Sequence, residues 1–325
     1  MVSRYSVIVT DARYFSEAIQ DILKQVDAEL ILAPCRSEGE VISQASKADA
    51  IITTSAIFSK QVLENLYQCK FIIRCGVGID NIDVKAATEK GILVAYLPDF
   101  YIEDVSNHIM ALILGSSRKI TFTDRLVRDG KCSFNKIQPI KQLKSKVLGL
   151  VGFGKISRCL LPKLKPFNFQ VLVYDPYISI LPREVEKADL PSLISRADFI
   201  IMNCPLTEEN REMIGEREFN LMKPEVYIIN TARGALINEV SLIKAIREKR
   251  ISGVALDVVT QEPVTSDHPL LQFDNVIITP HIAWYSEESL EEARLKAAED
   301  VVKVLKGDLP KYPVNPEVWT SSPKI

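Results

Sequence analysis

One stretch of this sequence, residues 147–175, constrains the fold more than any other. It reads VLGLVGFGKISRCLLPKLKPFNFQVLVYD. A short apolar run ends in the glycines at 152 and 154, a segment with helical spacing follows, and a second apolar run closes on Asp175. This order of strand, glycine turn, helix, strand and acid predicts the first half of a dinucleotide-binding βαβ unit.

The residue types in this stretch are those that a bound dinucleotide requires. Gly152 permits a tight turn out of the strand, and Gly154 lets a pyrophosphate approach the N–H groups at the start of the helix. Asp175 can accept hydrogen bonds from a ribose and would repel a 2′-phosphate, so we expect NAD rather than NADP. Ser157 stands where a third glycine is usual, which is a modest departure. The competing interpretation is an ordinary βα turn.

Length and charge limit the class of protein. A chain of 325 residues exceeds a comfortable single core, so two domains are expected. The net charge of −2 gives no reason to expect nucleic acid or an anionic membrane as partner, and a small molecule is expected instead. No secretion leader precedes the first strand-like run, and the most apolar segment, residues 109–114, is too short to span a membrane. A cytoplasmic location is therefore expected.

Cysteine and histidine content argues against disulfides and metal sites. No two of the six cysteines form a CxxC pair, so we expect reduced core thiols at Cys35, Cys69, Cys75, Cys132, Cys159 and Cys204. The three histidines form no HxxxH or HExxH pattern, so no metal is expected. Structural roles are expected for His108 and His268, which lack chemical partners in the sequence.

Apolar runs alternate with amphipathic segments along the rest of the chain, which predicts parallel α/β domains. The runs cover residues 7–9, 30–32, 50–53, 71–73, 92–95, 198–204, 226–231, 254–258 and 276–279. Leu97-Pro98-Asp99 has the composition of a hinge, and one long helix or a helix pair is expected over residues 102–129. Residues 131–146 are expected to be a solvated connector, and residues 287–305 a helix.

We therefore predict an α/β protein in which one doubly wound parallel-sheet domain is inserted into another. The chain is expected to cross at Pro98 and again near residue 300. Residues 1–101 and 299–325 then form a discontinuous flavodoxin-like substrate domain, and residues 102–298 form a Rossmann cofactor domain.

A second glycine loop, RCGVGIDNID at residues 74–83, directly follows an apolar run. Alternate glycines can present consecutive backbone N–H groups, which together with Arg74 could bind a carboxylate. The competing interpretation is a strand-to-helix turn capped by Asp80 or Asn81. Both interpretations stay open from the residues alone.

Three polar residues follow apolar runs of the second domain, at the strand ends where open α/β sheets bind ligands. Arg233 could hold a substrate carboxylate and polarise its carbonyl, His281 could donate a proton to the carbonyl oxygen, and Glu262 could hydrogen-bond the imidazole. With hydride from nicotinamide, this set would reduce a 2-oxo acid. Singly, each has an ordinary interpretation as a surface charge, a loop histidine or a turn residue.

Taken together, these motifs resemble those of the D-isomer-specific 2-hydroxyacid dehydrogenase family. The matching runs, in order, are RCGVGIDNID, GLVGFGKIS, VYDP, CPLT, INTARGALINE, ALDV, EP and TPHIAW. The resemblance implies an NAD(H)-linked oxidoreductase with a discontinuous substrate domain and a cofactor domain. It also implies a homodimer built on the helical region after the hinge.

The resemblance also assigns residues. Arg233, Glu262 and His281 match the family's catalytic triad. The candidate cofactor contacts are Gly152, Phe153, Gly154, Lys155, Ile156, Asp175, Cys204, Pro205, Thr207, Thr231, Ala232, Arg233, Asp257 and His281. The candidate substrate contacts are Arg74, Val77 and Gly78, which match the substrate-carboxylate loop, with Arg233, His281 and Trp284.

The run HIAWYSE at residues 281–287 looks more particularly like the branch that contains C-terminal-binding proteins. This likeness would put Trp284 near the substrate side chain and favour an apolar or thioether-bearing 2-oxo acid, unless Trp284 only packs the wall of the cleft.

The sequence leaves two alternatives to this function. The first is an NAD(H)-sensing scaffold or co-regulator, against which the intact triad argues, because a sensor needs no proton donor. The second is a dehydrogenase of the phosphoglycerate or the hydroxypyruvate and glyoxylate type.

Overall fold

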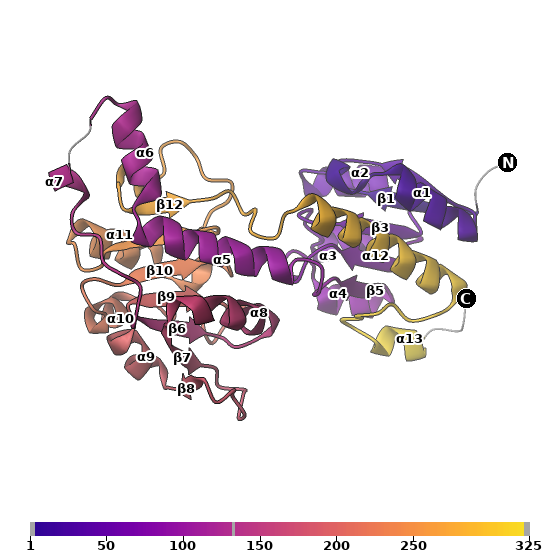
Figure 1. Cartoon of the computed structure of the whole chain (residues 1–325). Helices are drawn as coiled ribbons and strands as arrows, with labels where there is room; N and C mark the ends of the chain where they lie inside the picture. Colours follow the sequence, from indigo (N-terminus) through magenta and orange to yellow (C-terminus); the bar gives the residue numbers. More distant parts are fainter. Residues whose placement is uncertain (1–3, 132–133, 322–325) are drawn as a thin grey trace. The chain divides into compact units, whose positions relative to one another are not determined.

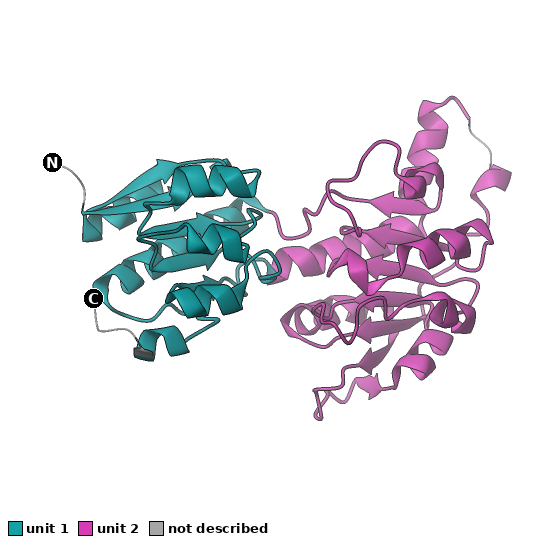
Figure 2. Cartoon of the chain, turned by 180° about the vertical axis from the view of Figure 1, so that it is seen from behind, with its two compact units in different colours: residues 1–101, 286–325 teal, residues 102–285 magenta. Residues whose placement is uncertain are grey.

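The computed structural model describes residues 4–131 and 134–321, and the chain divides into two compact units. Unit 1 comprises Met1–Tyr101 and Ser286–Ile325, and unit 2 comprises Ile102–Tyr285 (Figure 2). The sequence placed the second crossing at residues 298/299, inside helix α12 (Glu287–Lys306). That boundary is wrong, because all of α12 belongs to unit 1, where it packs against helix α1 and strand β4.

Unit 1 is built on a five-stranded sheet in the order β2-β1-β3-β4-β5, in which every pair is parallel. Its strands are β1 (Tyr5–Val9), β2 (Ala28–Leu32), β3 (Ala50–Thr53), β4 (Phe71–Arg74) and β5 (Leu93–Tyr96). The order 2-1-3-4-5 is that of the flavodoxin-like fold, so this prediction is confirmed.

Helices cover both faces of this sheet, which is why its strands read as continuous apolar runs (Figure 1). Helix α1 (Glu17–Leu23) packs with α12 on one face. A second group packs on the other face, with Ile8, Ile51 and Ile72 in its core, and comprises α2 (Glu38–Ala45), α3 (Lys60–Glu64) and α4 (Val84–Lys90). Beyond α12 the chain returns to β5, where the Asn315 side chain accepts from Val94 N at 2.7 Å, and ends in α13 (Glu317–Ser321).

Unit 2 contains a seven-stranded parallel sheet in the order β12-β11-β10-β9-β6-β7-β8. Counted from β6 this is the Rossmann order with one further strand, as predicted. Its strands are β6 (Val147–Val151), β7 (Gln170–Tyr174), β8 (Val185–Lys187), β9 (Phe199–Met202), β10 (Tyr227–Asn230), β11 (Gly253–Leu256) and β12 (Val276–Ile278). Strand β8 was missed, because its three residues, VEK, contain no apolar run.

Helices α5 (Ile102–Ser117) and α8 (Lys155–Leu164) pack together on one face of this sheet. The apolar core of the other face includes residues of α9 (Leu190–Arg196), α10 (Glu216–Leu221) and α11 (Glu239–Arg247). The predicted long helix is a pair, since Lys119 has a left-handed backbone (φ 52°) and separates α5 from α6 (Ile120–Arg128). The predicted connector contains the short α7 (Phe134–Ile137).

Short 3₁₀ helices complete the secondary structure. They are η1 (Ala12–Tyr14), η2 (Lys24–Val26), η3 (Lys165–Phe167), η4 (Gly234–Leu236) and η5 (Pro269–Gln272). Among the described residues, no helix combines the length and apolar character that crossing a bilayer requires.

The cysteines only partly match the expectation of core thiols. Cys35, Cys69 and Cys75 are buried, whereas Cys159 and Cys204 are only half-buried because they lie at a helix face and a strand end. All of these thiols are free. Cys132 lies outside the described residues.

Asp99 connects the hinge segment to the C-terminal part of unit 1. Its carboxylate lies 2.8 Å from Lys296 Nζ, 3.0 Å from Lys311 Nζ and 2.8 Å from the Tyr312 hydroxyl. Burial of Asp99 raises its pKa, but the hydrogen bonds from Lys296, Tyr312 and Lys311 outweigh burial and hold the pKa well below its usual value. The ionised form of Asp99 therefore stabilises unit 1.

Asp99→Asn is expected to destabilise the protein by about 1–3 kcal/mol near neutral pH, because the three donors lose a charged acceptor. The folded-state pKa lies below the unfolded value of about 3.9, so this contribution is present above that pH and is lost as pH falls further. Urea unfolding of both proteins at about pH 7 and about pH 3 measures the change. Asp21→Asn, at an exposed ion pair, is the control. An equal destabilisation at both pH values would contradict the assignment.

Candidate active site

The strands of unit 2 end in register at one edge of the sheet. Val151 pairs with Met202, Met202 with Asn230, Asn230 with Leu256, and Leu256 with Ile278. On the other side Val151 pairs with Tyr174. The residues after these strand ends therefore form one row, which runs Asp175, Gly152, Asn203, Thr231, Asp257 and Thr279.

The turn after β6 requires glycine at 152. Its backbone is left-handed (φ 94°), and a Cβ there would lie 2.7 Å from the Asn203 carbonyl oxygen. The next residue, Phe153, has a buried side chain and donates its backbone N–H to the Asp175 carboxylate at 2.8 Å. The second carboxylate oxygen accepts from Tyr177 N at 2.9 Å. Asp175 is thereby held beside the glycine turn.

The N-terminus of α8 has the properties of an anion site. Gly154 is its N-cap, and within the described chain no side chain caps the helix. No described heavy atom outside its chain neighbours lies within 4 Å of the place where a Gly154 Cβ would be. An uncapped helix N-terminus beside an open glycine is the kind of place at which a pyrophosphate can bind.

Ser157, in place of the usual third glycine, supports the turn. Its side chain is fully buried, and its hydroxyl donates to the Gly152 carbonyl at 2.7 Å. The Ser157 hydroxyl oxygen in turn accepts a hydrogen bond from Asn203 Nδ2 at 3.1 Å. Ser157 therefore links the glycine turn to the end of β9, a contact that a glycine could not make.

The loop after β9 carries Cys204, Pro205 and Thr207. The side chain of Asn210 closes it, donating to the Pro205 carbonyl at 2.7 Å and accepting from Thr207 N at 2.7 Å. Burial raises the pKa of the Cys204 thiol to about 11, so the thiol is neutral. Asn210 was not singled out from the sequence, because a loop amide gives no periodic signal.

The end of β10 presents Arg233. Asn230 is fully buried, and its side chain accepts from Ala232 N at 3.0 Å and donates to the Arg233 carbonyl at 2.8 Å. These bonds fold the strand end into a turn, and Arg233 Nη1 donates to the Ala232 carbonyl at 2.7 Å. The Thr231 hydroxyl is buried and has no hydrogen-bond partner among the described residues.

A buried carboxylate, Asp257, organises the loop after β12. It accepts from the Thr279 hydroxyl at 2.5 Å, from Ile282 N at 3.0 Å and from Ala283 N at 2.8 Å. Between these donors His281 has a left-handed backbone (φ 54°), which is strained for a residue with a side chain. The bonds to Asp257 hold that conformation.

His281 and Glu262 form a direct pair, with Nδ1 and Oε2 2.6 Å apart. Burial raises the pKa of Glu262, but the hydrogen bond and charge of His281 and the charge of Arg233 lower it further, so the net shift is downward. Glu262 is therefore ionised near neutral pH and accepts a hydrogen bond from Nδ1, so Nε2 is the ring nitrogen that does not face Glu262. The structure brings together all three residues that the sequence singled out for chemistry.

The expectation that His108 and His268 lack partners is wrong. His108 Nε2 lies 3.0 Å from the Thr279 hydroxyl and 3.7 Å from the Asp257 carboxylate. His268 Nε2 lies 3.5 Å from Glu239 Oε1. These partners are distant in sequence, so spacing could not reveal them, and the structural roles expected for both histidines stay a prediction.

In unit 1 the side chain of Arg74, in the predicted carboxylate-binding loop, is held in one position. Arg74 Nε donates to the Thr54 carbonyl at 3.1 Å, and its guanidinium lies over Gly76, where Nη1 would be 1.8 Å from an added Cβ. Val77 is exposed and Gly78 is half-buried. The following helix, α4, is capped by Asp83, whose side chain accepts from Ala86 N at 2.9 Å. The predicted caps, Asp80 and Asn81, are therefore wrong.

Trp284 lies three residues after His281 in the sequence and contacts it. Its indole Nε1 donates to the His281 carbonyl at 3.1 Å, and its ring meets Tyr285 edge-on. The indole therefore helps to hold the His281 loop.

Comparisons with known proteins show what the chain is similar to. Residues 110–283 match the model of the "D-isomer specific 2-hydroxyacid dehydrogenase, NAD binding domain" family. D-3-phosphoglycerate dehydrogenase of Methanocaldococcus jannaschii is 38% identical over 95% of this chain, but this chain spans only 59% of its length. Glyoxylate reductase of Thermococcus litoralis is 35% identical over 88% of this chain and 89% of its own.

A solved structure of a protein whose name places it among the dehydrogenases is also similar to this chain. D-lactate dehydrogenase from Aquifex aeolicus, solved with NAD and lactic acid, superposes with a TM-score of 0.81 at 28% identity. The match covers 93% of this chain and 96% of that one.

Ser157→Ala is expected to destabilise the protein by about 1 kcal/mol, because the Gly152 carbonyl and the Asn203 amide lose their buried partner. Urea unfolding measures the change, and Ser195→Ala on the exposed surface of α9 is the control. A variant as stable as the wild type would show that the Ser157 bonds do not support the turn.

Proposed function

Because this chain belongs to the D-isomer-specific 2-hydroxyacid dehydrogenase family, we propose that it interconverts a 2-oxo acid and a D-2-hydroxy acid with NAD as the redox partner. The observation that carries the proposal is the 2.6 Å pair of Glu262 and His281 on the sheet edge that carries the glycine turn. A dehydrogenase needs a proton donor there. An imidazolium that is stabilised by an ionised carboxylate can be that donor.

Each member of the triad has a distinct role in the proposal. Arg233 binds the substrate carboxylate and polarises the carbonyl. His281 Nε2 donates a proton to the carbonyl oxygen during reduction and accepts it during oxidation. Glu262 holds Nδ1 and stabilises the imidazolium form.

The cofactor site follows from the row of strand ends. We assign the pyrophosphate to Gly152, Gly154 and the N-terminus of α8, and the ribose to Asp175. The remaining contacts are assigned to the loops after β9, β10 and β11, with Cys204, Pro205, Thr207, Thr231, Ala232 and Asp257. When bound, NADH supplies the hydride for reduction.

The proposed substrate contacts include Arg74, Val77 and Gly78 of unit 1 and Trp284 of unit 2. A guanidinium next to a glycine backbone is suited to a carboxylate. The indole of Trp284 offers an apolar surface to the side chain of the acid.

The scaffold alternative is not favoured. The relatives compared above are dehydrogenases and a reductase, and the Glu262–His281 pair has no purpose in a protein that only senses NAD(H). The branch that contains C-terminal-binding proteins rests on residues 281–287 alone.

The location and the assembly are also proposed. Free thiols at the described cysteines fit the reducing cytoplasm, which thiol labelling of intact and lysed cells would test. For a homodimer, the best surface is α6, in which no described residue is buried and which stands away from the sheet of unit 2 (Figure 1). Ile120 and Val127 on α6 and Phe134 on α7 are exposed apolar residues that a second copy would cover.

His281→Ala is expected to lower kcat for reduction by roughly a hundredfold or more and to leave NADH binding nearly unchanged. The oxidation of NADH or NADPH would be followed by absorbance, with several 2-oxo acids tested as substrates. These are glyoxylate, pyruvate, hydroxypyruvate, phosphohydroxypyruvate and a thioether-bearing 2-oxo acid. NADH should be the better cofactor, because Asp175 repels a 2′-phosphate. Undiminished turnover by the variant, or no turnover of any 2-oxo acid by the wild type, would refute the proposal.

The double variant Ile120→Asp/Val127→Asp is expected to convert a dimer into a monomer of 36.5 kDa, since charges on a buried apolar interface are costly. Light scattering after gel filtration gives the mass. Val240→Asp, at an exposed site on α11, is the control and should remain dimeric. A dimer that survives the double variant would exclude this surface.

A further inference from the structure

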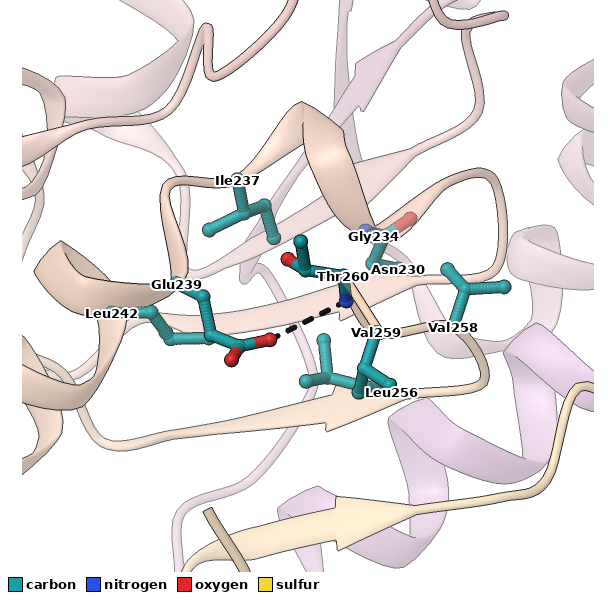
Figure 3. A pocket seen from close by; sticks show the side chains of 9 residues that line it. All are labelled: Asn230, Gly234, Ile237, Glu239, Leu242, Leu256, Val258, Val259 and Thr260. Carbon is teal, nitrogen blue, oxygen red and sulfur yellow. Dashed lines mark hydrogen bonds between the residues drawn. The ribbon is translucent and has the colours of Figure 1, made fainter. Parts of the chain in front are cut away.

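The catalytic Glu262 lies in a loop, residues 258–268, whose two ends contact a single carboxylate. That carboxylate belongs to Glu239, the first residue of α11. Thr260 N donates to Glu239 Oε2 at 3.4 Å, and His268 Nε2 lies 3.5 Å from Glu239 Oε1. Figure 3 shows the Glu239 side chain reaching toward Thr260. Glu239 thus bridges the start and the end of the loop.

His268 is oriented for this contact. It is 9% exposed, and its Nδ1 accepts from Leu270 N at 3.3 Å. An Nδ1 that accepts leaves the proton of a neutral imidazole on Nε2, the nitrogen that faces Glu239. The histidine therefore caps η5 with one nitrogen and contacts Glu239 with the other.

The bridge is connected to the triad through two adjacent backbone groups. Next to Thr260, Val259 donates its N–H to Glu262 Oε1 at 3.2 Å, and the other oxygen of Glu262 binds His281. On the opposite side the Val259 carbonyl lies close to Gly234, next to Arg233, since a Cβ on Gly234 would lie 2.1 Å from it. A shift of Thr260 would therefore move Val259 and Glu262 with it.

Packing alone does not fix this part of the loop, because a small cavity lies beside it (Figure 3). The cavity has a volume of about 10 Å³, room for about one water molecule. Its lining residues are Asn230, Gly234, Ile237, Glu239, Leu242, Leu256, Val258, Val259 and Thr260. It is too small for a substrate, but it leaves Thr260 without full apolar support.

We propose that Glu239 and His268 are positioning residues that hold the 258–268 loop, so that Glu262 stays against His281. They act through the loop backbone on Glu262, which the charges of His281 and Arg233 also influence. The inference rests on the proposed function, because its consequence for catalysis requires the triad to transfer a proton.

A purely structural role for Glu239 makes a different prediction. A carboxylate in the first turn of α11 also stabilises the helix through its dipole. Removing that interaction would lower the thermal stability but would not change the protonation behaviour of His281. The two roles can therefore be separated by experiment.

Four variants make the comparison. Glu239→Ala removes the bridge. His268→Asn keeps an acceptor for Leu270 N but loses the group that faces Glu239, whereas His268→Gln keeps a donor at the Nε2 position. Glu248→Ala, an exposed residue just past the end of α11, is the matched control.

Glu239→Ala and His268→Asn are expected to lower kcat for reduction by roughly tenfold to a hundredfold, with little change in NADH affinity. The alkaline limb of the kcat profile should move to lower pH, because Glu262 no longer stabilises the charged imidazole as well. His268→Gln should recover part of the loss. Glu239→Ala should add little to Glu262→Gln, since both act on one unit.

A readout independent of turnover uses the three histidines of the chain. In the protein labelled at histidine, the NMR titration of His281 should move toward lower pH in Glu262→Gln and also in Glu239→Ala, and should be unchanged in Glu248→Ala. An unchanged His281 titration in folded Glu239→Ala would overturn the inference, as would full additivity with Glu262→Gln. If the two variants show these NMR shifts but the wild-type protein reduces no 2-oxo acid, the proposed function is refuted and the positioning role stands.

Discussion

The in-register parallel ladder of unit 2 is the constraint on which the candidate site depends. Six strands stop at one level, so Asp175, Gly152, Asn203, Thr231, Asp257 and Thr279 are neighbours although more than a hundred residues separate the first from the last. At the carboxyl ends of the strands, short polar side chains then hold the turns by which the chain leaves the sheet. Ser157, Asn230 and Asp257 do this by binding backbone or neighbouring polar groups, and so aim the glycine turn, Arg233 and His281.

Three carboxylates at this edge differ in what surrounds them, and their roles differ accordingly. Asp257 is buried and accepts three hydrogen bonds, so it is suited to holding a loop. Glu262 is partly exposed and pairs with an imidazole, so it can respond to a change of charge on its partner. Asp175 uses backbone donors to stay in place at the end of β7. The same functional group thus serves as anchor, charge partner and proposed ribose ligand.

Much of the fold could be predicted because both sheets are covered on two faces, which makes each central strand a continuous apolar run. The strand starting at Ala50 was located to the residue, whereas β8, with the sequence VEK, offered no such run. The second domain crossing was misplaced because the helical spacing of residues 287–305 does not say which sheet the helix covers. Arg233, Glu262 and His281 could be singled out from their places after apolar runs, but the contacts of His108 and His268 join residues far apart in the chain and leave no local pattern.

Two of the donors that hold the His281 loop to Asp257 are main-chain N–H groups, at Ile282 and Ala283. Any residue except proline supplies such a donor, so the anchor places little demand on which side chains stand at those positions. Substitutions at 282 could therefore accumulate during divergence without disturbing the backbone that presents the imidazole. In this arrangement the side chain that follows His281 can vary, because Asp257 holds the backbone that presents the imidazole.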